Sequence, residues 1–272
     1  MRPEGTVERR RWSGLRLAML CALGAALLVA AGVAAGLVLA RREDPGGTAK
    51  RSQIRPFIPQ GSGPPAAPFA SGRPGGPYAT AYVRGGTLLY DAPGGRPKLR
   101  LTRHTEWGSP RFLGVVGQRG PWLAVQAPEL KNHEVAWLPL GKATLGSVRY
   151  SLHADVSRRL LTVRYGRRTI RRLAIAVGRP SNPTPLGRFS VTDKLLVTDK
   201  SSPYGCCVLA LTGHQTRLPS DWPGGDRLAI HATRATWSIG HAVSFGCMRA
   251  AASEVRWLVK SIPLGTPVFI RR

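Results

Sequence analysis

The feature that most limits how this chain can fold is an uncharged apolar segment near its start. Leu17–Ala40 holds 24 consecutive residues without a charged side chain, most of them Leu, Ala or Val. A helix of that length can cross a hydrocarbon core of about 30 Å. Because the apolar region of a cleaved signal peptide is about 7–15 residues long, the length favours a retained transmembrane helix, although Val38-Leu39-Ala40 leaves a cleavage site open.

The net charge of the chain limits the classes of partner that it can bind. The sequence has 40 Lys and Arg against 14 Asp and Glu, a net charge of +26. Such a balance points to nucleic acid, an anionic membrane surface or an anionic wall polymer. Residues 146–272 carry 20 of the basic residues, in scattered pairs and without a motif that would present them to a groove. We therefore predict no nucleic-acid partner.

Residues 1–77 divide into a tail, the apolar segment and a linker. Residues 1–16 form a basic tail, and basic residues flank both ends of the apolar segment, so the positive-inside rule does not orient it. Residues 41–77 are rich in Gly, Pro and Ser, which favours an extended linker over a packed core.

Residues 78–145 alternate short apolar runs with Gly- and Pro-rich turns, a pattern that predicts a small β-barrel. The order of its elements, ending in Gly120–Val125 and Val135–Leu138, resembles the bacterial SH3-like modules that accompany cell-wall enzymes. Three tryptophans could line a peptide groove there or fill the core of the barrel. They are Trp107, Trp122 and Trp137.

Residues 146–272 read as a mostly β domain with one helix. Arg159–Tyr165 and Thr169–Val177 flank a turn at Gly166 and predict a hairpin, and further strand-like runs follow. Near the end, Val255, Leu258, Val259 and Ile262 share one face of a predicted helix, which Ser253 would cap and Pro263 would end.

Between these strands and the helix lie a histidine and a cysteine that could form a catalytic pair. A thiol is a good nucleophile only as thiolate, so Cys247 needs a base, and His231 can supply one. Gly246 allows close backbone approach, and the N–H groups of Gly246 and Cys247 could hold an oxyanion. Arg249 and the start of the following helix would add positive potential that favours the thiolate.

Two motifs in this domain resemble those of a known family. The first motif begins with His231-Ala232-Thr233 and continues to S-x-G-C-M-R, whose Cys247 lies 16 positions after His231. It resembles the signature of the YkuD-type L,D-transpeptidases. The segment Asn182–Phe189 resembles their earlier P-T-P-x-G-x-F motif. The resemblance implies a β-sandwich catalytic domain in which the Cys247 thiolate attacks the third residue of a peptidoglycan stem tetrapeptide. D-Ala leaves, and the amine of a neighbouring stem resolves the acyl-enzyme into a 3→3 cross-link.

The resemblance also implies roles for the surrounding residues. The main-chain carbonyl at or near Ala232 would orient the His231 ring, and Ser244 and Arg249 would support the cysteine loop. The substrate groove would include Thr184, Pro185 and Gly187. Phe245 departs from the family pattern, since many members have His before the Gly-Cys pair.

The remaining cysteines and histidines predict no metal site or cofactor. Cys206 and Cys207 are adjacent and lack the companions of a zinc site. On a strand they would point to opposite faces, and a bond from either to Cys247 would inactivate the enzyme. His153 and His214 read as ordinary polar surface residues, and His241 as exposed.

A peptidoglycan-acting domain must lie outside the cytoplasm, so we expect a single-pass membrane protein with residues 1–16 inside. Its partners would be stem peptides, anionic wall polymers and carbapenem-type inhibitors, with the membrane bound through Leu17–Ala40. Other acceptors remain open: water would make it an L,D-carboxypeptidase and a protein lysine an anchoring enzyme. In a different class, the chain could be a wall-binding scaffold with an inactive cysteine domain.

Overall fold

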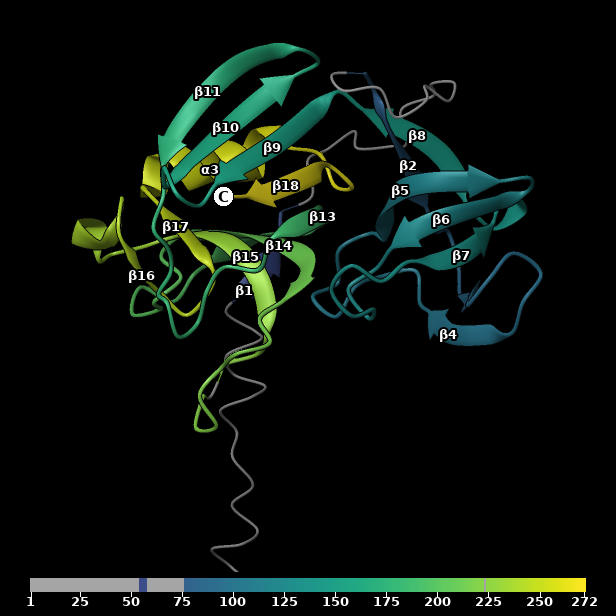
Figure 1. The fold of residues 1–272 in the computed structure, drawn as a ribbon, viewed down its shortest axis with the longest axis horizontal. Helices are drawn as coiled ribbons and strands as arrows, with labels where there is room; N and C mark the ends of the chain where they lie inside the picture. Colours follow the sequence, from purple (N-terminus) through teal and green to yellow (C-terminus); the bar gives the residue numbers. More distant parts are fainter. Residues whose placement is uncertain (1–53, 58–75, 223) are drawn as a thin grey trace, which may run out of the picture. The chain divides into compact units, whose positions relative to one another are not determined.

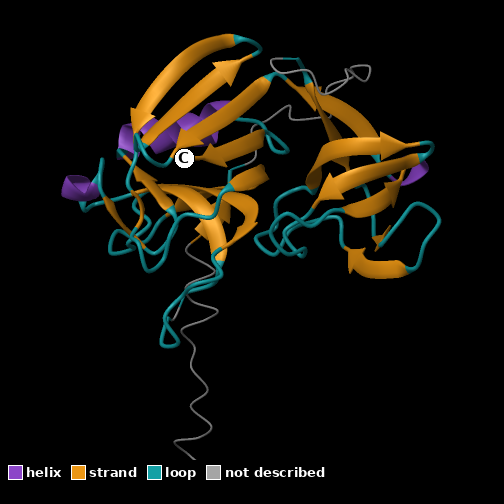
Figure 2. Cartoon of the chain, viewed as in Figure 1, coloured by secondary structure: helices purple, strands orange, loops and turns teal. Residues whose placement is uncertain are grey.

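A computed structural model describes residues 54–57, 76–222 and 224–272 of the chain (Figure 1). Strands dominate this part, and its α-helix is α3 (Ala252–Ser261), as Figure 2 shows. The predicted tail, the apolar segment Leu17–Ala40 and most of the predicted linker lie outside the described residues. Among those described, no helix combines the length and apolar character needed to span a bilayer.

The first folded unit is a seven-stranded antiparallel sheet, called here the N-terminal module. Its strands follow the order β4-β3-β7-β6-β5-β2-β8, and a 3₁₀ turn at Leu140–Lys142 precedes the last of them. They are β2 (Tyr78–Tyr82), β3 (Thr87–Tyr90), β4 (Pro97–Leu101), β5 (Phe112–Arg119), β6 (Trp122–Gln126), β7 (Ala136–Pro139) and β8 (Thr144–Val148). The predicted domain boundary at residue 145 falls inside β8.

Alternation along these strands separates a buried face from a half-exposed face, as the sequence predicts. Leu89, Leu123 and Leu138 are fully buried and belong to the core of the module. Trp122 and Trp137 are only partly buried and do not join that core. Trp122 meets Tyr90 edge-on at 5.1 Å between ring centroids. The core-filling interpretation is therefore wrong for these two tryptophans.

The second unit is built on a nine-stranded sheet in the order β11-β10-β9-β18-β13-β14-β15-β17, with β1 paired beside β13. Its strands are β1 (Ile54–Pro56), β9 (Tyr150–Asp155), β10 (Leu160–Tyr165), β11 (Arg168–Ala174), β13 (Gly187–Val197), β14 (Cys207–His214), β15 (Arg227–Ala232), β17 (Met248–Ala250) and β18 (Pro267–Arg271). Two short strands, β12 (Val177–Gly178) and β16 (Ala242–Ser244), pair in parallel beside it. We call this unit the catalytic sheet.

The predicted hairpin and helix are both present. Strands β10 and β11 pair antiparallel around Gly166, whose φ of +59° is the left-handed conformation that a glycine tolerates. Helix α3 packs on β14 and β15 through buried Val255, Leu258 and Val259. The predicted Ser253 cap is wrong, because the helix begins at Ala252 and no side chain caps it.

Part of the predicted linker 41–77 forms a strand. Beyond Ser190, β13 leaves its pairing with β18, which opens one edge of that strand. Strand β1 fills this edge by pairing with Leu195–Val197. Phe57 continues the contact, since its N–H donates to the carbonyl of Lys194 at 2.5 Å. The Pro-rich composition led to the prediction of a linker here, although Pro is compatible with an edge strand.

The N-terminal module is bonded directly to the catalytic sheet. The Gln126 amide donates to the carbonyl of Arg188 at 2.5 Å, and the Arg188 guanidinium donates to the carbonyl of Val115 at 3.1 Å. The Asn132 side-chain amide donates to the carbonyl of His214 at 2.7 Å, and its oxygen accepts from the N–H of His214 at 2.8 Å. These bonds join β13 and β14 to loops and strands of the module.

Candidate active site

His231 and Cys247 lie on neighbouring elements of the catalytic sheet. His231 is the fifth residue of β15, and Cys247 immediately precedes β17, which pairs with β15 in parallel. Both side chains line one pocket with a cavity of about 240 Å³. Folding thus brings together two residues that are 16 positions apart in the sequence, as their motif predicts.

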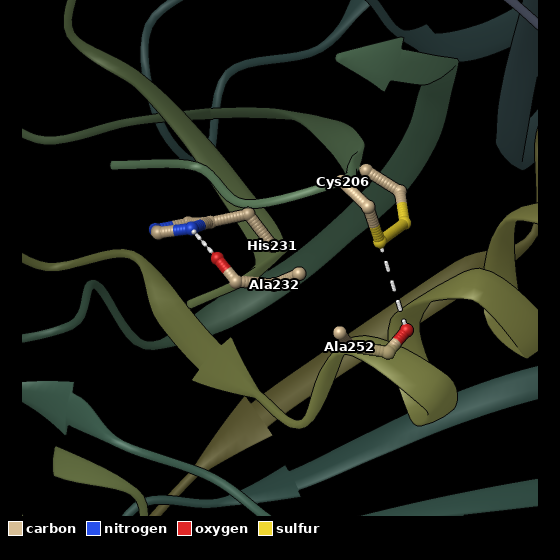
Figure 3. The surroundings of a disulfide bond; sticks show 5 residues. Cys206, His231, Ala232 and Ala252 are labelled. Carbon is tan, nitrogen blue, oxygen red and sulfur yellow. Dashed lines mark hydrogen bonds between the residues drawn. A yellow bond between two sulfur atoms is a disulfide. The ribbon is translucent and has the colours of Figure 1, made fainter. Parts of the chain in front are cut away.

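The His231 ring is held in one orientation. Its Nδ1 lies 2.7 Å from the carbonyl oxygen of Ala232 (Figure 3), which can only accept, so Nδ1 carries the hydrogen. The other nitrogen, Nε2, is then left with a lone pair that can take a proton. The pKa of His231 is lowered to about 4, mainly by burial and to a smaller extent by the charge of Arg249, while the Ala232 bond opposes the shift. His231 is therefore a neutral base at physiological pH.

Cys247 is a free and partly buried thiol that donates to the carbonyl of Arg227, with 3.7 Å between sulfur and oxygen. Loss of contact with water raises its pKa to about 11, although the Ala229 N–H and the charge of Arg249 both lower it. The charge of Arg249 does favour the thiolate, as predicted, but it is the smaller effect. Desolvation outweighs the nearby positive charge, so the resting pair is a thiol beside a neutral imidazole.

The loop Ser244–Cys247 is fixed by hydrogen bonds to its own backbone. The Ser244 hydroxyl donates to the carbonyl of Cys247 at 2.6 Å and accepts from the N–H of Gly246 at 3.1 Å. Ser244 thus supports the cysteine loop, as the resemblance implies. Of the two predicted oxyanion donors, the Gly246 N–H is already engaged by Ser244.

The earlier P-T-P motif and a glutamine fix the same loop from outside. Buried Thr184 donates to the carbonyl of Gly246 at 2.8 Å and accepts from the N–H of Gly178 at 2.8 Å. The Gln215 amide donates to the carbonyl of Phe245 at 2.9 Å. Gly246 has a φ of +117°, and a Cβ there would overlap the Gln215 amide, so this loop requires glycine.

The predicted groove residues do not line the pocket. The Thr184 side chain is hydrogen-bonded to the cysteine loop, and neither Thr184 nor Pro185 is among the residues that line the pocket. Gly187 opens β13 and faces the ring of His133 in the N-terminal module. None of the three lines this pocket, and Thr184 is the one that bonds to the cysteine loop.

Tyr204, Trp222 and Arg234, which the sequence did not single out, line the pocket together with Phe245. Phe245 packs at a tilt against Trp222, at 4.8 Å between ring centroids, and the Arg179 guanidinium lies 4.3 Å from its ring centroid. Tyr204 meets the His231 ring edge-on at 5.0 Å. The arginines in the lining are Arg227, Arg234 and Arg249. The pocket therefore combines aromatic surface with positive charge, which suits a substrate with apolar and anionic parts.

Cys206 and Cys207 form a disulfide with each other (Figure 3). The prediction that they point to opposite faces of a strand is wrong, because Cys206 lies in the turn before β14 and only Cys207 belongs to the strand. The pairing leaves Cys247 as a free thiol. Among the residues that the structure describes, no group of His, Cys, Asp and Glu could hold a metal ion.

The other histidines have diverse surroundings. His241 is exposed, as predicted. His153 is half-buried on β9 and stacks on Phe269 at 5.0 Å, and His214 bonds to Pro128 and Asp226. The interpretation of His153 and His214 as ordinary surface residues is therefore wrong.

The arrangement agrees with the comparison to known proteins. Residues 149–270 match the family model for the L,D-transpeptidase catalytic domain, YkuD. Residues 149–270 are thus similar to the catalytic domain of the YkuD-type L,D-transpeptidases. The match begins after β8, so the SH3-like character of the N-terminal module stays a prediction.

Two curated relatives carry related names. The putative L,D-transpeptidase YkuD of Bacillus subtilis is 29% identical over 126 residues, which cover 46% of this chain and 68% of that protein. L,D-transpeptidase 1 of Mycobacterium tuberculosis is 27% identical over 125 residues, 42% of this chain and 47% of that protein. Among solved structures, L,D-transpeptidase 3 of M. tuberculosis in complex with a faropenem-derived adduct aligns with a TM-score of 0.36 and 18% identity, over 53% of this chain and 69% of that one. The similarity to this family therefore comes from the family model and the sequence relatives.

Proposed function

We propose that this protein is a peptidoglycan L,D-transpeptidase that works through an acyl-enzyme on Cys247 and forms 3→3 cross-links. The observation that carries the proposal is the ring orientation of His231. Because Nδ1 is bound to the Ala232 carbonyl, Nε2 is the proton acceptor in a pocket that also contains the Cys247 thiol. A cysteine with an oriented neutral base is the arrangement that nucleophilic acyl transfer needs.

In the first half of the reaction, Cys247 Sγ attacks the carbonyl carbon of the third stem residue while its proton passes to His231 Nε2. The carbonyl oxygen becomes an oxyanion, for which the Cys247 N–H is the predicted donor. Collapse of this intermediate breaks the C–N bond to D-Ala, and the imidazolium returns the proton to the departing amine. The product is a thioester on Cys247.

In the second half, the amine of a neighbouring stem attacks the thioester carbon and gives a proton to His231. The C–S bond breaks, the new amide forms, and the proton returns from His231 to the sulfur. Because the resting pKa values are about 11 for the thiol and about 4 for the imidazole, a separated ion pair is unfavourable at rest. Proton transfer therefore accompanies formation of the S–C bond.

The charge of the site supports an anionic substrate. Arg234 and Arg249 line the pocket, and peptidoglycan stems carry free carboxylates, whereas the charge of Arg227 is already paired with Glu106. The basic residues of the whole chain would also draw the protein to anionic wall polymers, an attraction that salt weakens. The same site could act on other acceptors, so the test must identify the product as well as the acyl-enzyme.

The first experiment is intact-mass analysis of the full chain after incubation with faropenem or a carbapenem. We expect one adduct on Cys247 and none on Cys247→Ala, while the matched variant Cys21→Ala keeps the adduct. An adduct that persists on Cys247→Ala would overturn the assignment of the nucleophile.

The second experiment is mass spectrometry of muropeptides after incubation of the full chain with wall sacculi. New 3→3 cross-linked dimers are the expected product. Tripeptides without dimers would identify water as the acceptor, and a muropeptide joined to a protein lysine would identify an anchoring enzyme. Unchanged sacculi together with no β-lactam adduct would favour the non-catalytic scaffold.

We propose in addition that Leu17–Ala40 anchors the protein with the catalytic domain outside the cytoplasm, where its substrate lies. Protease added to intact, wall-stripped cells should cut within residues 43–77 and release the folded units. Protection from external protease would contradict this location. A mature N-terminus at Arg41 would instead replace the anchor with a cleaved signal peptide and leave the enzymatic proposal unchanged.

A further inference from the structure

One loop of the N-terminal module reaches the catalytic sheet beside the nucleophile. Residues 103–110, between β4 and β5, are called here the module loop. Its Thr105 hydroxyl donates to the carboxylate of buried Asp193 on β13. The next two residues, Glu106 and Trp107, both contact Arg227 at the start of β15. The loop therefore meets the strand that carries His231.

Arg227 is held on every side of its guanidinium. Its Nη1 forms an ion pair with Glu106 at 2.5 Å, and the Trp107 ring centroid lies 5.1 Å from its central carbon. Inside the sheet it donates to the carbonyl of Leu211 at 2.6 and 3.0 Å and to the Thr192 hydroxyl at 2.8 Å. Only 11% of its side chain is exposed. Glu106 and Trp107 are the contacts that the module supplies.

The backbone of the same arginine touches the nucleophile. The carbonyl of Arg227 accepts the hydrogen bond from the Cys247 thiol. Trp107 and Cys247 also pack against the same small apolar cluster, formed by the buried side chains of Leu195, Val208 and Ala229. The module loop is thus linked to Cys247 in two ways, through the arginine backbone and through the cluster that both residues contact.

We propose that Trp107 and Glu106 are positioning residues of the active site, which hold Arg227 so that its carbonyl fixes the Cys247 thiol and which keep water away from the sulfur. This inference rests on the proposed function, because it assigns the N-terminal module a part in setting the reactivity of the nucleophile. The module is then a component of the site and does more than carry the catalytic sheet.

Two physical effects follow from loss of the Trp107 ring, and they act differently on different reagents. Water that reaches the sulfur, together with a weaker bond to the Arg227 carbonyl, favours the thiolate and lowers the thiol pKa. A small alkylating reagent needs only a thiolate, so its reaction at neutral pH becomes faster. A β-lactam or stem peptide also needs the sulfur in one orientation, so acylation becomes slower.

The alternative is that the module loop only docks the N-terminal module onto the catalytic sheet and has no effect on the nucleophile. That role is shared by Gln126, which bonds to the carbonyl of Arg188 and the hydroxyl of Ser190 on β13 and touches neither Arg227 nor the apolar cluster around Cys247. The ion pair of Lys98 with Glu134, at 2.7 Å within the module, involves neither Arg227 nor the apolar cluster. These residues offer matched controls for loss of docking and for loss of a surface charge pair.

The test compares full-length Trp107→Ala, Trp107→Phe and Glu106→Gln with the controls Gln126→Ala and Glu134→Gln. Two rates are measured from pH 6 to pH 11: iodoacetamide alkylation of Cys247, followed by peptide mass, and acylation by faropenem. A thermal melt of each variant reports folding.

For Trp107→Ala we expect the alkylation profile to move about one pH unit lower and faropenem acylation at pH 7 to fall about tenfold. Glu106→Gln should shift both in the same directions by less, and Trp107→Phe, which keeps a ring over Arg227, should resemble the wild type. The controls should change the melting temperature at most.

An unchanged profile in both Trp107→Ala and Glu106→Gln overturns the inference, as does an equal shift in Gln126→Ala. If Trp107→Ala does not fold, Glu106→Gln alone decides by the same criterion. If wild-type protein is alkylated but never acylated by faropenem, the proposed function fails, and the alkylation profiles still decide the positioning role.

Discussion

Thr184 links the P-T-P motif to the nucleophile, and Thr184→Val should test that link directly. Valine keeps the shape of threonine and removes only the hydroxyl. The hydroxyl lies in a buried position between the N–H of Gly178 and the carbonyl of Gly246, at 2.8 Å from each. The substitution therefore leaves two buried backbone groups without their partner.

Each unpaired buried group costs about 1–3 kcal/mol, so Thr184→Val should lower the free energy of unfolding by about 2–5 kcal/mol. A folded domain has about 5–15 kcal/mol in total, so most of the protein should remain folded at 25 °C. The released Gly246 carbonyl also lets the cysteine loop move. A loss of about 1.4 kcal/mol in transition-state stabilisation corresponds to a tenfold slower acylation, and we expect at least that.

The assay is urea unfolding together with the rate of faropenem acylation per folded molecule. Thr212→Val is the matched control, because the buried Thr212 hydroxyl accepts from the N–H of Ser190 at 3.0 Å on the side of β14 that faces β13. It should lose stability and keep its acylation rate. Wild-type stability and acylation in Thr184→Val would refute the reasoning, and equal slowing in both variants would show that the effect is global.

Two further predictions concern protons. His231→Ala should slow acylation roughly 10²–10⁴-fold at pH 7, and because the thiol pKa is about 11, its rate should keep rising above pH 9; a wild-type rate at pH 7 would exclude His231 as the base. The unfolding free energy should fall as the pH drops from 6.5 to 4, because the pKa values of folded His231 and His153 lie near 4 whereas the unfolded chain takes up those protons near 6.5. Urea midpoints at pH 7.5 and 5 measure this, His153→Gln should show a smaller difference, and equal midpoints in the wild type would contradict it.

The sequence was sufficient for features that depend on local pattern. Alternation around Gly166 predicts the β10–β11 hairpin, and the four apolar residues from Val255 to Ile262 predict the buried face of α3. The pairing of His231 with Cys247 followed from a motif with known spacing. In each case the deciding interactions lie between residues close in the chain or within one motif.

The sequence was not sufficient where a residue acts through a distant partner. Thr184 contacts Gly246, 62 positions later, and Glu106 contacts Arg227, 121 positions later. Neither separation leaves a periodic trace in the sequence. The thiol pKa was also beyond reach, because the sequence shows the charge of Arg249 but not the loss of water that outweighs it. Strand β1 depends on an open edge of β13 that only the folded sheet creates.

The place of β18 has a consequence for the order in which the protein can fold during synthesis. Strand β18 lies inside the catalytic sheet, parallel to β9 on one side and antiparallel to β13 on the other, although it is the last strand along the chain. The N-terminal module needs only strands from Tyr78 to Val148, so it can close while the rest is still being made. Until Pro267–Arg271 has been synthesised, the edges of β9 and β13 that pair with β18 have no partner strand. During that interval the folded module offers β13 a surface to bind, through the bond from Gln126 to Arg188.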